Sequence, residues 1–120
     1  MLTVFGSTAL DTIKTPNKVL KDVLGGAATF ASISASFFVK PRLIAVVGKD
    51  FPKKYHKILA ERLDLNGLSI KDGKTFRYSG SYDNTLSLRT TLRTDLNVLK
   101  NFKPVVPEEY KKSKFVYLAN

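Results

Sequence analysis

The chain has 120 residues, of which 43% are hydrophobic, 25% charged and 11% aromatic. This length and composition are typical of one globular domain and exclude two separate catalytic domains. The absence of cysteine and the single histidine exclude disulfides, thiolate metal sites, multi-histidine sites and a cysteine nucleophile. No apolar run approaches the ~20 residues of a membrane span and no signal peptide is recognisable, so we expect a cytoplasmic protein without a membrane partner.

The net charge of +10 would suit a protein that binds nucleic acid, but its distribution does not. Residues 1–70 and residues 71–120 each contain ten basic and five acidic side chains. Because no segment concentrates the positive charge and no aromatic residues are interleaved with the lysines, we expect no nucleic-acid partner.

The first half of the chain predicts alternating strands and helices. An apolar run over 2–7 predicts a buried strand, and β-branched residues around the turn dipeptide Pro16-Asn17 predict a hairpin of strands at 10–14 and 18–23. Uncharged small residues over 27–38 predict a helix buried nearly all round. The continuous apolar run Arg42–Gly48 predicts a parallel strand covered on both faces, within a right-handed βαβ unit.

The second half begins with an amphipathic helix that starts near Pro52 and ends before Gly67, and its apolar face carries Tyr55, Ile58, Leu59 and Leu63. Period-two alternation then predicts an antiparallel hairpin over 75–93. One face carries Phe76, Tyr78 and Tyr82, and the polar face carries the hairpin's three arginines, for which solvent exposure is the default: Arg77, Arg89 and Arg93. A helical turn is expected at Glu108–Lys112 and a further buried strand at Phe115–Ala119.

Two features are candidates for ligand binding, each with a structural alternative. Gly25-Gly26 precedes a helix, where glycines let the backbone approach a ligand closely but also simply form a tight turn. Asp11 follows a strand by a few residues, where its carboxylate would accept hydrogen bonds from two adjacent hydroxyls, or would serve as a solvated turn residue or cap.

Four stretches together resemble the N-terminal part of the ribokinase/PfkB family of sugar and nucleoside kinases. They are Val4-Phe5-Gly6-Ser7 with Asp11, Gly25-Gly26-Ala27-Ala28-Thr29-Phe30-Ala31, Val46-Val47-Gly48-Lys49-Asp50-Phe51 and Gly73-Lys74-Thr75-Phe76-Arg77-Tyr78. They occur in the order and at the spacing of the family over the whole chain, which is more specific than any one stretch.

The resemblance implies an α/β sandwich with a mostly parallel central sheet and a small β-sheet lid, incomplete at the C-terminus. Residues 1–120 would be the N-terminal portion of the kinase domain, with lid strands near 10–23 and 75–93. By position, Asp11 would bind acceptor hydroxyls, the backbone of Gly25-Gly26 would form a hinge against the substrate, Thr75 would face the pocket from the lid, and Asn120 would make a polar substrate contact.

Two departures from the family concern the acceptor site. Ala9 stands where sugar kinases of the family usually carry an Asn, and Phe30 stands where the helix usually offers an Asn side chain. Because both changes remove hydroxyl-binding groups, the sequence favours an aryl-bearing or base-bearing acceptor that stacks on Phe30, or else a site that has drifted.

A third departure is that the Gly-Ala-Gly-Asp catalytic motif of the family is absent. The resemblance therefore implies a kinase that depends on ATP and Mg²⁺ when complete, with both sites outside this chain, no catalytic or metal-binding residue within it, and no activity of the chain alone. The complete enzyme would phosphorylate a hydroxymethyl group of a sugar or nucleoside-like acceptor. The main alternative is a non-catalytic binding module that dimerises through the lid hairpin.

Overall fold

Two four-stranded β-sheets and two α-helices make up the computed structural model, which describes residues 1–120. The central sheet is entirely parallel, with the strand order β5-β4-β1-β8. Its strands are β1 (Leu2–Gly6), β4 (Arg42–Gly48), β5 (Asp64–Lys71) and β8 (Phe115–Ala119). Every residue of β4 is buried, as the continuous apolar run predicts for a strand inside a parallel sheet.

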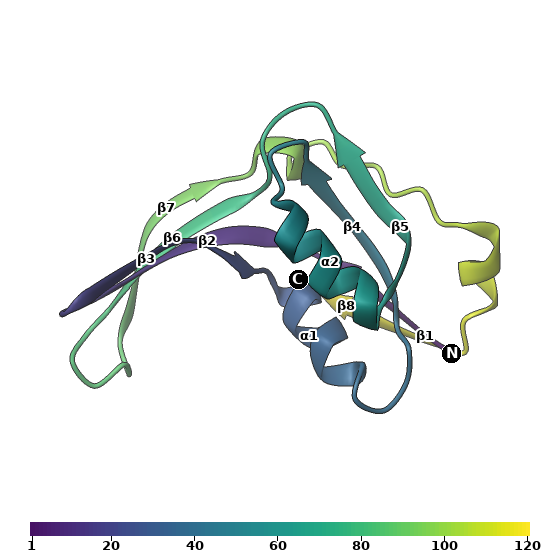
Figure 1. Ribbon diagram of the computed structural model, residues 1–120, viewed down its shortest axis with the longest axis horizontal. Coiled ribbons are helices and arrows are strands. Elements are labelled where there is room, and N and C mark those ends of the chain that lie inside the picture. The colour runs from purple at the N-terminus through teal and green to yellow at the C-terminus, as the bar shows by residue number, and fades with distance from the viewer.

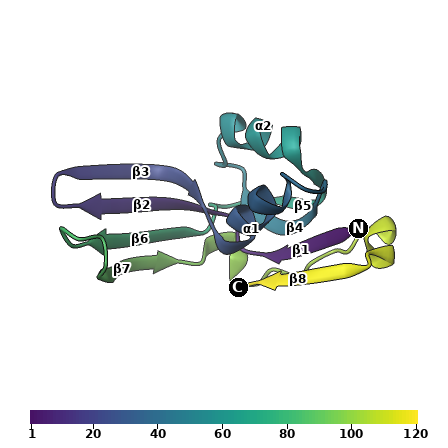
Figure 2. The same cartoon turned by 90° about the horizontal axis from the view of Figure 1, so that it is seen from below.

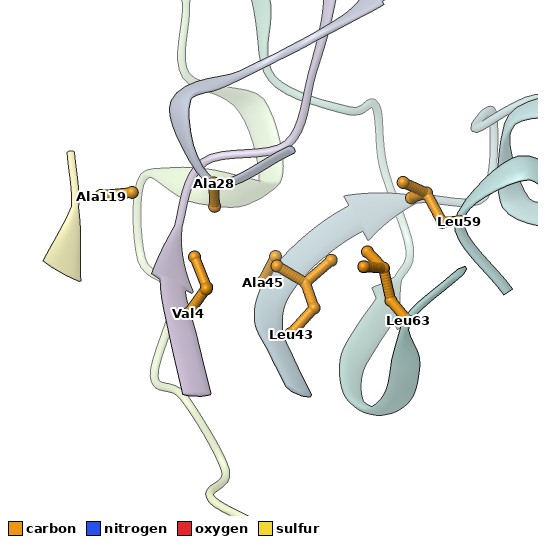
Figure 3. Packing of buried hydrophobic residues seen from close by; sticks show 7 residues of the cluster. All are labelled: Val4, Ala28, Leu43, Ala45, Leu59, Leu63 and Ala119. Carbon is orange, nitrogen blue, oxygen red and sulfur yellow. The ribbon is translucent and has the colours of Figure 1, made fainter. Parts of the chain in front are cut away.

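Both helices, α1 (Ala27–Ala35) and α2 (Lys53–Arg62), pack against the same face of this sheet. Figure 3 shows how Leu59 and Leu63, at the end of α2, lie against Leu43 of β4, while Ala28 of α1 lies near Val4 of β1. The small side chain of Ala28, which is fully buried, lets α1 approach the sheet closely.

The opposite face of the central sheet is covered by an irregular segment that contains two short 3₁₀ helices, η1 (Asn97–Leu99) and η2 (Glu108–Lys112). The ring of Phe102 stacks on Phe5 of β1 with 6.4 Å between centroids. Tyr110 of η2 is 2% exposed, and its hydroxyl donates to the Asp64 carboxylate at 2.6 Å and accepts from the Gly67 N–H at 3.2 Å. These contacts fix η2 against β5.

The second sheet has the order β3-β2-β6-β7 and extends away from the central sheet (Figures 1 and 2). Its strands are β2 (Ala9–Thr15), β3 (Lys18–Gly25), β6 (Arg77–Tyr82) and β7 (Arg89–Asp95). Each of the two predicted hairpins is present, and parallel pairing of β2 with β6 joins them into one sheet. We call this sheet the lid. The prediction of a mostly parallel α/β sheet with a small β-sheet lid is confirmed.

Two predictions about elements are wrong, and one strand was not predicted. The helix at 27–38 ends at Ala35 and is buried only on the face toward the sheet, so Phe30, Phe37 and Phe38 are 60%, 68% and 88% exposed. The sequence did not reveal β5, because a register shift opposite Arg42 and Ile44 interrupts its alternation. Strand β8 forms but is exposed over its first four residues, since it pairs only with β1 at the sheet edge.

Candidate functional site

A cavity of about 530 Å³ lies where the lid meets the start of α1. Its volume is within the range of sites that hold small organic ligands. Some of the lining residues are polar or charged, and most of the others are aromatic or aliphatic. The lining residues are Ser7, Ala9, Asp11, Ile13, Gly26, Ala27, Phe30, Phe76, Tyr78, Tyr82, Arg89, Leu96, Leu99 and Asn120.

The carboxylate of Asp11 is the acidic group of this cavity. Asp11 lies on β2 between Val23 of β3 and Tyr78 of β6, so strands on both sides fix its backbone. Its Oδ1 atom is buried and has no hydrogen-bond partner, and burial raises the pKa of the carboxyl above its usual value. A buried carboxylate oxygen without a donor is costly, and a ligand hydroxyl would supply the missing donor.

The predicted glycine pair lies directly beside this carboxylate. A Cβ atom on Gly25 would be 2.0 Å from Oδ2 of Asp11, so only glycine leaves room for the carboxylate there. Gly26 has a φ of +102°, and a Cβ atom on it would be 2.4 Å from the carbonyl oxygen of Ser7. The tight turn into α1 is therefore present, and Gly25 also leaves room for the Asp11 carboxylate.

Phe30 and Asn120 line the same cavity from opposite ends of the chain. The carbonyl oxygen of Asn120 accepts hydrogen bonds from the hydroxyl of Ser7 at 2.9 Å and from the Ser7 N–H at 3.3 Å. The Ser7 hydroxyl also accepts from the N–H of Ala27 at 3.1 Å. Ser7 thus connects β1, α1 and the C-terminal residue at the cavity wall. Ser7 lies within the first motif of the resemblance, but no role of its side chain was expected from the sequence.

Thr75 does not lie where the resemblance implied. It precedes β6, is completely buried and does not line the cavity. Its hydroxyl donates to Oδ1 of Asp50 at 2.7 Å and accepts from the N–H of Gly48 at 3.0 Å. Gly48 is the last residue of β4 and Asp50 follows it closely, so Thr75 joins the central sheet to the lid instead of facing the pocket.

The three lid arginines do not share one solvated face. Arg77 is half-buried and forms ion pairs with Asp22 at 2.6 Å and Asp50 at 2.7 Å. Arg93 pairs with Asp95 on its own strand at 2.8 Å. Arg89 instead lines the cavity, and its guanidinium carbon is 5.5 Å from the ring centroid of Tyr78.

The irregular pairing of β7 explains this separation. Ser79 pairs with Arg93 but the next residue, Gly80, pairs with Thr91, so Leu92 is an extra residue in β7. Such a bulge reverses the side on which the following side chains point. Simple alternation, which placed Arg89 and Arg93 on one face, is therefore wrong here, whereas Phe76, Tyr78 and Tyr82, which alternation placed on one face, all line the cavity.

A parallel α/β sheet, a four-stranded lid and a cavity where they meet, with an unpartnered carboxylate oxygen, are features of the N-terminal part of a ribokinase-like fold. The chain is 29% identical, over 120 residues, to a cytidine kinase of Thermococcus kodakarensis. That alignment includes 98% of this chain and 42% of the relative, so the chain spans about two fifths of its length. No family model matches the chain.

Solved structures show the same fold. A candidate ribokinase from Agrobacterium tumefaciens superposes with a TM-score of 0.76 at 18% identity, over 98% of this chain and 43% of that one. The nucleoside kinase of Burkholderia thailandensis in complex with inosine gives a TM-score of 0.67 at 17% identity, over 81% and 35%. A ribokinase of Cryptococcus neoformans in complex with ADP gives 0.68 at 16% identity, over 80% and 34%. The resemblance to the N-terminal part of ribokinase-family kinases is thus confirmed.

The side chains of this chain do not form a cluster of metal ligands. Nowhere do three or more His, Cys, Asp or Glu side chains come together closely enough to hold a metal ion. The Gly-Ala-Gly-Asp motif is absent from the sequence. No helix has both the length and the apolar character that crossing a membrane requires.

Proposed function

We propose that residues 1–120 form the acceptor-binding part of an ATP-dependent kinase that phosphorylates a hydroxymethyl group of a nucleoside or a related sugar. The observation that carries this proposal is the unpartnered Oδ1 of Asp11, which belongs to a cavity that also contains aromatic side chains. A nucleoside has the matching chemistry, since its ribose offers adjacent hydroxyls and its base offers an aromatic face.

The site residues have distinct roles in this proposal. Asp11 accepts hydrogen bonds from the acceptor hydroxyls, and Gly25 and Gly26 leave space for its carboxylate and for the approach of the substrate. Phe30 stacks on the base, and Asn120, which also lines the cavity, makes a polar contact to the acceptor. The similarity to a cytidine kinase and to an inosine-bound nucleoside kinase supports a nucleoside over a simple sugar.

ATP would supply the phosphoryl group with Mg²⁺, and we place both sites and the aspartate base in the part of the kinase outside residues 1–120. The test compares the full-length kinase with residues 1–120 in an ATP-dependent phosphorylation assay with nucleosides and pentoses. We expect turnover with nucleosides by the full-length kinase and none by residues 1–120. Turnover by residues 1–120, or stabilisation of the full-length protein by free pentoses alone, would contradict the proposal.

We also propose that the lid forms a homodimer contact. Leu86, Leu88 and Leu92 lie on or beside β7 and are 61%, 71% and 49% exposed, which is unusual for three neighbouring leucines of a monomer. Burial of these side chains against a second copy would remove them from water. Light scattering over a range of concentrations tests this contact, and Leu88→Ser should weaken association. A persistent monomer would refute it.

A further inference from the structure

Arg89 is the only basic side chain that lines the cavity. Unlike Arg77 and Arg93, it has no carboxylate partner within 4.0 Å, and its guanidinium lies over the ring of Tyr78. A guanidinium that stacks on an aromatic ring keeps its N–H donors free at its edge. The cavity therefore contains one acceptor group without a donor, Asp11, and one donor group without an acidic partner, Arg89.

The fold directs Arg89 into the cavity by a specific irregularity. Arg89 pairs with Tyr82 across the β6–β7 ladder, and paired residues point to the same side of a sheet. Arg93 pairs with Ser79 and points to the other side, because the extra residue Leu92 separates the two arginines in β7. Without the bulge, Arg89 would lie on the same side as Arg93 and outside the cavity.

The chemistry of a guanidinium limits what Arg89 can recognise. It offers five N–H donors in a planar fork and no acceptor, so it matches an edge with two adjacent acceptors. Cytosine has such an edge at O2 and N3, and guanine and hypoxanthine have one at O6 and N7. Uracil has a hydrogen on N3, and adenine has an amino group beside N7, so both place a donor where the fork needs an acceptor.

We propose that Arg89 is a specificity-determining residue that selects nucleosides whose base has a carbonyl oxygen beside an unprotonated ring nitrogen. The inference rests on the proposed function, since it concerns the base end of the same acceptor site. Asp11 binds the ribose hydroxyls of each nucleoside alike, whereas Arg89 distinguishes the bases.

The experiment measures binding of five nucleosides to the full-length protein by calorimetry. We expect cytidine, guanosine and inosine to bind at least about ten-fold more tightly than uridine and adenosine, because a bidentate hydrogen-bonded pair discriminates between bases by about this factor. Arg89→Met keeps the aliphatic stem and removes the donors, so it should abolish this preference by weakening the binding of cytidine, guanosine and inosine far more than that of uridine and adenosine. Arg89→Lys keeps the charge without the fork and should lose most of the preference.

Arg93→Met is the matched control, because it removes a guanidinium from the same strand on the opposite side of the lid. It should leave the ranking of the nucleosides unchanged, and thermal melts of the three variants establish that each is folded. If Arg89→Met weakens all five nucleosides equally, or if the wild type binds them without this ranking, the inference is overturned and the proposed function stands. If the wild type binds no nucleoside, the proposed function itself fails.

Fructose 6-phosphate serves as a separate probe, because a phosphate would also satisfy a guanidinium. We expect no binding of this sugar phosphate. Binding that depends on Arg89 would assign the guanidinium to an anionic acceptor and overturn the inference.

Discussion

Replacement of Gly25 by alanine should disable the acceptor site while the fold remains intact. The new Cβ atom would lie 2.0 Å from Oδ2 and 2.5 Å from Cγ of Asp11, so the carboxylate must move. The atoms that must give way are the end of a flexible side chain, not backbone. The substitution therefore acts on the group that we propose binds the acceptor hydroxyls.

Two opposing effects on stability nearly cancel. Gly25 lies in β3 without the positive φ that favours glycine, so alanine should stabilise the fold by about 0.4–1 kcal/mol through the unfolded state. A displaced Asp11 rotamer should cost about 0.5–1.5 kcal/mol. The net change in the free energy of unfolding should thus remain within about 1 kcal/mol. A lost hydrogen bond to a charged group should weaken nucleoside binding by about 1.5–3 kcal/mol, or roughly 10- to 150-fold.

Gly26→Ala is the matched control, because this substitution should lower the stability of the fold. Gly26 has a φ of +102°, and its Cβ would meet the backbone carbonyl of Ser7 at 2.4 Å. Strain of this kind costs about 1–3 kcal/mol before the collision is added. Urea unfolding and cytidine calorimetry on the full-length protein measure both quantities for both variants. The reasoning is refuted if Gly25→Ala binds cytidine with wild-type affinity, or if it loses as much stability as Gly26→Ala.

Three further substitutions test the electrostatics and packing around the site. Burial raises the pKa of Asp11, so the charged carboxylate destabilises the folded protein at pH values above the folded pKa, and this cost disappears as the pH falls. Asp11→Asn should therefore raise the melting temperature at pH 7. An unchanged melting temperature would contradict a raised pKa of Asp11. Burial would raise the pKa of Asp50 as well, but hydrogen bonds from Thr75 and Arg77 outweigh burial and lower the pKa. The charged carboxylate of Asp50 therefore stabilises the folded protein above pH 3.8, and this stabilisation is lost as the pH falls through the folded pKa. Asp50→Asn should cost about 1–2 kcal/mol in urea unfolding at pH 7 and less below pH 3.8, whereas a pH-independent loss would refute the role of its charge. Tyr110→Phe leaves the buried backbone N–H of Gly67 in β5 without its acceptor and should lower the free energy of unfolding by about 1–3 kcal/mol in the same assay. An unchanged free energy of unfolding would show that water replaces the hydroxyl.

Much of this architecture follows from local sequence patterns. The uninterrupted apolar run of β4 predicts a buried parallel strand, and Pro16-Asn17 predicts the first lid hairpin; both elements are present. The shared face of the aromatic residues of β6 is visible from the period of two, but the pattern does not indicate that this face lines the cavity. Asp11 and Phe30, both candidates from the motifs, also line it.

What the sequence does not reveal depends on pairing between distant segments. The bulge at Leu92 exists only because β7 pairs with β6, so alternation along β7 alone cannot tell that Arg89 and Arg93 diverge. The burial of Thr75 depends on its contact with the end of β4, which lies about 25 residues earlier in the chain. The exposure of β8 depends on its position at the sheet edge, and its apolar composition indicates the opposite.

The two residues between β1 and β2 have a mechanical consequence. These strands belong to different sheets, yet only Ser7 and Thr8 separate them along the chain. The buried hydroxyl of Thr8 accepts a hydrogen bond from Thr29 of α1 at 3.1 Å, which anchors one side of the connection. Ser7 and Thr8 therefore form the shortest connection between the two sheets, and a change in the inclination of the lid would alter the backbone at these two residues. Since Ser7 also lines the cavity, a bound molecule would touch this connection directly.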